Sequence, residues 1–139
     1  MSVSIRKNSM NADPDRIADV RHRVQDGVLV VELVGRASVR LLMSHVIEHL
    51  DAWTGHDRLI YDFRGWDVSA LTADSLLGVT GGFKPVHDVR SRARAALLIR
   101  PHLEELARIL IAVYESEGQQ VELCYFFEEP EAFAWLKQA

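Results

Sequence analysis

The chain has 139 residues, a formal net charge of −4 and an ordinary balance of apolar and charged residues. This length suits one domain that buries enough apolar surface to fold without disulfides or a structural metal. The negative charge argues against general nucleic-acid binding, which needs a dense basic face. No apolar run approaches membrane-spanning length and the N-terminus lacks a signal-peptide core, so we expect no membrane span.

The single cysteine, Cys124, cannot form a disulfide within the chain, which favours a reducing, cytoplasmic location. It lies in an apolar run with no neighbouring base to activate a thiol, so we expect it to be a core residue. Residues 1–18 are polar and predict a flexible tail before a single domain over residues 19–139.

The first predicted structure is a β-hairpin. Asp26-Gly27 separates two runs, at 21–24 and 28–34, and this dipeptide favours a tight turn with positive φ at both central residues. The second run is almost entirely apolar. It therefore predicts a central strand that is covered on both faces.

A helix is predicted next. Ser38 is a suitable N-cap, apolar residues recur at helical spacing as far as Trp53, and Gly55 ends the pattern.

Three strand–helix units follow. The strands are expected at 58–63, 95–99 and 121–126, and the helices begin near Thr72, Pro101 and Pro130. Alternating units of this kind predict parallel pairing with right-handed crossovers, hence an α/β fold. The helix over residues 73–83 contains three glycines, each costing about 1 kcal/mol relative to alanine, so tertiary contacts must hold it or it must move.

Several segments resemble the SpoIIAA-like group of STAS-type domains over about residues 20 to 138. They are the strand end Tyr61-Asp62-Phe63-Arg64, the loop 66–74, the helix after Arg100-Pro101 and the closing segment 127–136. The resemblance implies a mixed sheet of four to five strands, an N-terminal hairpin followed by βα repeats, and helices packed mainly on one face. Relatives with this fold include anti-sigma-factor antagonists, which bind proteins and are switched by serine phosphorylation. The fold also resembles that of lipid-carrying CRAL-TRIO domains.

One group of residues is the candidate ligand- or partner-binding edge, because ligands of parallel sheets bind where strands end and helices begin. Its members are Asp62, Trp66, Asp67, Ser69, Thr72, Asp74 and Ser75. By resemblance, Ser75 is the aligned phosphorylation candidate: Asp74-Ser75 matches the start of the antagonist pattern Asp-Ser-Ser-Gly, and residues 76–78 depart from it. The structural alternative is that Thr72 caps a helix, Asp74 complements its dipole and Asp67 makes a turn. Trp66 either anchors a partner or covers the core.

His45-Val-Ile-Glu48-His49 matches the His-x-x-Glu-His pattern of inverted zinc peptidases, and two histidines four apart on a helix can share a metal. The predicted apolar stripe centres on Val39, Val46 and Leu50. It places Glu48 opposite the stripe, His45 toward solvent and His49 at its edge. We therefore expect a solvated helix face and no metal.

These observations favour a non-enzymatic, cytoplasmic binding or regulatory domain that contacts a protein partner through the edge after the third strand. The alternative is a carrier of a small apolar or lipid-like ligand, held near Trp66, Leu76 and Phe83. A metal-dependent hydrolase using His45, Glu48 and His49 is the third hypothesis. We expect no catalytic residues and no cofactor, and we expect the chain to form a homodimer.

Overall fold

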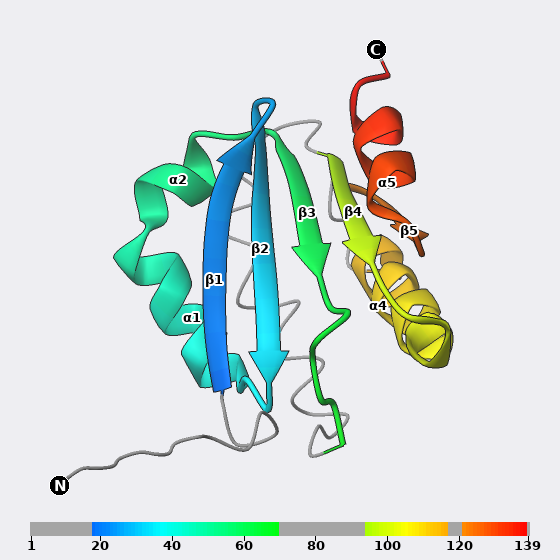
Figure 1. Cartoon of the computed structure of the whole chain (residues 1–139), viewed down its shortest axis with the longest axis horizontal. Coiled ribbons are helices and arrows are strands. Elements are labelled where there is room, and N and C mark those ends of the chain that lie inside the picture. The colour runs from blue at the N-terminus through cyan, green and yellow to red at the C-terminus, as the bar shows by residue number, and fades with distance from the viewer. Residues whose placement is uncertain (1–17, 70–93, 117–120, 139) are drawn as a thin grey trace, which may run out of the picture.

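The computed structural model describes residues 18–69, 94–116 and 121–138. Its centre is a five-stranded sheet in the order β1-β2-β3-β4-β5 (Figure 1). The strands are β1 (Ala18–Gln25), β2 (Val28–Gly35), β3 (Arg58–Asp62), β4 (Arg94–Leu98) and β5 (Glu122–Phe126). The β1–β2 pair is antiparallel and the other three pairs are parallel, which confirms the predicted mixed sheet.

Helices cover both faces of this sheet unequally. The described helices are α1 (Val39–Glu48), α2 (Leu50–Thr54), α4 (Glu104–Ser116) and α5 (Glu129–Leu136), with a short 3-10 turn, η2 (Pro101–Leu103), before α4. Core residues of α1, α2 and α4 pack with one face, and those of α5 pack with the other. In Figure 1, α1 and α2 lie beside β1 and β2, and α5 lies near β4 and β5. The expectation that helices pack mainly on one face is confirmed.

The β1–β2 hairpin follows from its turn residues. Asp26 and Gly27 have φ values of 54° and 77°, as a tight turn between right-twisted strands requires. Alternation along β2 then directs Leu29, Val31 and Leu33 to the larger core, and Val28 and Val30 to the α5 side. The prediction of a central strand covered on both faces is confirmed.

The predicted helix from Ser38 to Gly55 is interrupted. Ser38 caps α1 as expected, its hydroxyl accepting a hydrogen bond from the Leu41 N–H at 3.1 Å. His49 then leaves the helical conformation, with φ −124° and ψ 36°, before α2 begins at Leu50. The break changes which residues face inward. Leu50, expected at the centre of the apolar stripe, is 49% exposed, so that part of the prediction is wrong.

Several predicted features lie outside the described residues. They are the tail except Ala18, the glycine-rich helix over 73–83, and the site residues Thr72, Asp74 and Ser75. Among the described helices, none has the length and apolarity needed to cross a bilayer.

Candidate functional site

Asp62 ends β3 as a buried, fully paired carboxylate. It is only 4% exposed, and its side chain points to the face that α5 covers. Both oxygens are engaged by Arg64: Nε donates to Oδ1 and Nη2 donates to Oδ2, each at 3.0 Å, and the Arg64 backbone N–H also donates to Oδ1. A bidentate pair of this kind holds the loop after β3 in one geometry.

The pair extends to helix α5 and strand β1. Arg64 Nη2 donates to Glu129 Oε2 at 3.3 Å, and Arg23 Nη2 donates to Glu129 Oε1 at 3.0 Å. The hydrogen bond to Asp62 is the main reason that the pKa of Arg64 is raised. Because its charge is neutralised within this network, Asp62 connects the strand end to α5 and offers no free carboxylate to a ligand.

Trp66 covers the core on the opposite face. The residue is 5% exposed, its indole N–H donates to the Ala37 carbonyl at 3.0 Å, and its ring contacts Phe63 with centroids 4.8 Å apart. Of the two roles predicted for Trp66, the structure places it in the core-covering one. Asp62 and Trp66 are four residues apart and would share a face of a continuous strand, but the turn at Arg64-Gly65 interrupts the alternation, so that Trp66 joins Phe63 in the larger core.

Asp67 and Ser69 form an exposed turn. Asp67 Oδ1 accepts from the Ser69 backbone N–H at 3.0 Å, and Oδ2 accepts from Arg36 Nε at 3.3 Å. These contacts, led by the Ser69 N–H, lower the pKa of Asp67. The turn role predicted for Asp67 is therefore its local structural role.

The loops after β2, β3 and β4 are joined into one surface. The Gly35 N–H donates to the Gly65 carbonyl at 2.9 Å, and the Asp67 N–H donates back to the Gly35 carbonyl at 2.7 Å. Arg100 Nε donates to the Arg64 carbonyl at 2.8 Å. We call the outward-facing residues of these loops the strand-end surface: Arg36, Gly65, Asp67, Ser69 and Arg100. It lies where the parallel strands end, the place predicted for ligand binding.

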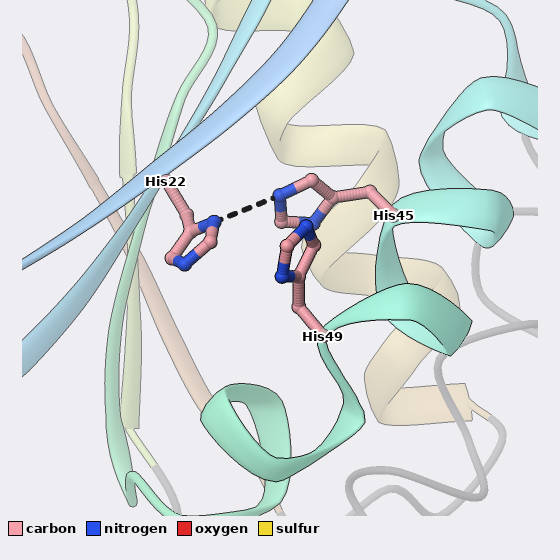
Figure 2. A group of neighbouring side chains, drawn as sticks. All are labelled: His22, His45 and His49. Carbon is pink, nitrogen blue, oxygen red and sulfur yellow. Dashed lines mark hydrogen bonds between the residues drawn. The ribbon is translucent and has the colours of Figure 1, made fainter.

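A second cluster lies between β1 and α1. His22 projects from β1, and His45 and His49 project from α1 and its C-cap, so that the three rings point toward one another (Figure 2). Their ring centroids are 4.5 to 4.9 Å apart, and one nitrogen from each lies within 4.8 Å of the others. We call these residues the histidine cluster.

Hydrogen bonds define the proton positions in this cluster. The Trp53 indole N–H donates to His45 Nδ1 at 3.1 Å, so His45 Nδ1 carries no proton. The neutral His45 ring must then carry its proton on Nε2, which donates to His22 Nδ1 at 3.0 Å. The result is a directed chain from Trp53 through His45 to His22.

Burial keeps the rings of His45 and His22 neutral. Loss of hydration lowers the pKa of His45 to about 4, with further lowering by the nearby His49 and His22 rings, partly opposed by Asp19. Burial and His49 also lower the pKa of His22. At neutral pH both rings are therefore uncharged, which is the form that ligates metals.

This cluster corrects one prediction. His45 was expected to face solvent, yet it is 7% exposed and packs against Trp53. The buried residues of α1 are Leu42, His45 and Val46, so the inward face of the helix includes His45. Glu48 is not part of the cluster. His22 was missed, although it lies two residues after buried Val20 and so shares its inward face.

Leu76 and Phe83, two residues of the predicted carrier site, lie outside the described residues. The third residue of that site, Trp66, fills the core with its ring. Cys124 is half-buried on β5, and burial raises the pKa of its thiol, which disfavours the reactive thiolate.

No known family model and no curated protein sequence matches the chain. Among solved structures, an uncharacterised DUF3478-family protein from Shewanella loihica PV-4 with a SpoIIAA-like fold is similar at a TM-score of 0.61 and 14% identity, covering 92% of this chain and 99% of that one. An anti-sigma factor antagonist from Mycobacterium paratuberculosis is also similar, with a TM-score of 0.61 and 13% sequence identity. The match covers 91% of this chain and 99% of that one. Identities this low show the fold alone. The chain therefore has a SpoIIAA-like, STAS-type fold, as its sequence resemblance implied.

Proposed function

We propose that this chain is a non-enzymatic regulatory domain that binds a protein partner through the strand-end surface. The fold shared with an anti-sigma factor antagonist supports a protein-binding role. The observation that carries the proposal is the cross-linking of three loops by backbone hydrogen bonds and by Arg100.

This surface is organised before any partner arrives. Trp66 anchors the loop after β3 to the core, and the Gly35–Gly65 and Asp67–Gly35 hydrogen bonds join this loop to the loop after β2. A surface already fixed in shape loses little conformational entropy on binding, which favours specific association. The proposed function is the one predicted from sequence. In it, Asp62 and Trp66 do not contact the partner but hold the loop that carries the strand-end surface.

The chemistry of the surface indicates the kind of partner. The Arg36 side chain is 64% exposed and pairs with Asp67 at the rim. Arg100 is exposed, and no carboxylate of the described residues is within ion-pair distance of it. We therefore infer a partner that presents acidic and hydrogen-bonding groups to the two arginines. We also propose that Ser75 is phosphorylated, that the protein is cytoplasmic and that it forms a homodimer.

Quantitative affinity capture from the source cells tests this function. The test variant is Arg36→Glu/Arg100→Glu, which reverses both cations of the surface. The control is Arg108→Glu, a matched reversal on the exposed face of α4. We expect one or a few proteins to be retained by the wild-type chain and the control. Reversing two interface cations should weaken that binding by at least about tenfold, checked with the purified partner by calorimetry.

Two results would contradict the proposal. One is a captured protein that all three chains retain equally, which would move the interface elsewhere. The other is a small apolar molecule carried stoichiometrically through native mass spectrometry with no protein partner, which would select the carrier alternative. Circular dichroism of each variant ensures that lost binding does not reflect unfolding.

A further inference from the structure

We propose that His22, His45 and His49 form a binding site for a divalent first-row transition metal of the zinc class. The inference is independent of the proposed protein-binding function. It departs from the expectation of no metal, which rested on His45 facing solvent. The three residues come from two elements that the fold brings together, and their rings converge (Figure 2).

The spacing of the nitrogens suits such an ion. A tetrahedral Zn²⁺ with bonds of about 2.0–2.1 Å holds its ligand atoms roughly 3.3 Å apart. His22 Nδ1 and His45 Nε2 are 3.0 Å apart, and all three ligand atoms lie within 4.8 Å of one another. Small rotations of the rings would bring the third nitrogen to the ion. In the metal-free form, a proton shared by His22 and His45 lies where the ion would bind.

Core packing does not account for three imidazoles at this position. Burying the polar His45 ring is costly unless both nitrogens are satisfied, and the structure satisfies them only with Trp53 and another histidine. A leucine at position 45 would remove that requirement but could not accept the hydrogen bond of the buried Trp53 N–H, and neither His22 nor His49 has such a role toward Trp53 in the structure described. Three imidazole side chains together are a strong donor set for Zn²⁺, Cu²⁺, Ni²⁺ and Co²⁺.

Access to the site is open on two sides. His22 lies on the exposed outer strand β1, and His49 lines a surface depression over the α1–α2 junction. Of the described residues with metal-binding side chains, only these three gather here. Three protein ligands leave a fourth position for water or for a group from another molecule.

Binding should leave a signature on Trp53. When His45 ligates through Nε2, the proton of its neutral ring moves to Nδ1, and no net proton is released. Nδ1 then faces the Trp53 N–H and no longer accepts its hydrogen bond. Because Trp53 is fully buried, its fluorescence should report this change even with Zn²⁺, an ion without unpaired electrons.

Calorimetric titration of Zn²⁺ into the full-length, chelator-stripped protein tests the site. We expect one equivalent to bind, with a simultaneous change in tryptophan fluorescence. His22→Gln and His49→Gln should each weaken binding by more than the 10–100-fold that loss of a supporting second-shell contact costs. The matched control is His102→Gln, which replaces an exposed histidine on η2 outside the cluster. This variant should bind Zn²⁺ as the wild type does.

Co²⁺ supplies a second readout, because tetrahedral coordination by nitrogen gives intense visible bands that octahedral hydration does not. The proposal is overturned if no stoichiometric Zn²⁺ binding occurs. It is also overturned if His22→Gln and His49→Gln bind as tightly as the wild type, or if Co²⁺ bound to the protein remains octahedral. Thermal unfolding of both variants without metal distinguishes loss of a ligand from loss of the fold.

Discussion

Acidification should destabilise the metal-free protein through His45. In the folded chain the pKa of His45 is about 4, below its ordinary value of 6.5. As pH falls through 6.5 the unfolded chain takes up a proton that the folded chain does not. The stability contributed by the neutral, buried ring is therefore intact above pH 6.5 and is lost as pH falls toward 4.

The expected size of this effect follows from the two pKa values. Their separation corresponds to about 3 kcal/mol of folding free energy in total. About 2 kcal/mol of it should be lost between pH 7 and pH 5, where most of the difference in proton uptake occurs. For a domain with a urea m-value of about 2 kcal/mol per molar, the unfolding midpoint should fall by roughly 1 M.

Urea unfolding in the presence of a chelator measures this change. His45→Gln is the informative comparison, because glutamine can still accept a hydrogen bond from Trp53 but does not titrate. The wild type should lose its stability advantage over His45→Gln as pH falls, while other acid-sensitive groups cancel in the difference. His102→Gln should follow the wild-type curve. An advantage that stays constant within about 0.5 kcal/mol from pH 7 to pH 5 would refute the reasoning.

Four substitutions test the supports of the fold by the same urea measurement. Arg64→Ala should cost about 2–4 kcal/mol because it leaves Asp62 buried without its partner; a loss below about 1 kcal/mol would contradict this. Trp66→Phe should cost at least about 1 kcal/mol through the lost indole hydrogen bond, and an unchanged midpoint would argue against that bond. Ser38→Ala should cost about 1 kcal/mol by removing the cap of α1. Gly27→Ala should cost about 1 kcal/mol because φ is 77°, although the space there is open; a neutral result would contradict the turn geometry.

Local sequence signals predicted much of the fold. The Asp26-Gly27 turn and the Ser38 cap depend on the conformations of neighbouring residues, so a short window of sequence contains the information. The alternation of strands and helices predicted parallel pairing, and the registers of β2 to β5 confirm it. The interruption at His49 was not predicted, because an apolar period that continues to Trp53 gives no signal for it.

The candidate sites depended more heavily on distant residues. Sequence placed Asp62 and Trp66 at one edge, but Arg64, which pairs with Asp62, also donates to Glu129, a residue 65 positions after Arg64 in the chain. The ring of Trp66 packs inward against Phe63, and the Ala37 carbonyl after β2 accepts its N–H. Neither Glu129 nor the Ala37 carbonyl can be identified as a partner from spacing along the chain.

By itself, the sequence determined the order of strands and helices, the hairpin and the place where the parallel strands end. These features follow from alternation, helical period and turn chemistry, all of which act over a few residues. The tertiary structure alone decided that His22 meets His45 and His49, and that the strand-end loops join into one surface. Such contacts form when separate elements pack to bury their apolar faces, and that packing also fixes which polar side chains come together.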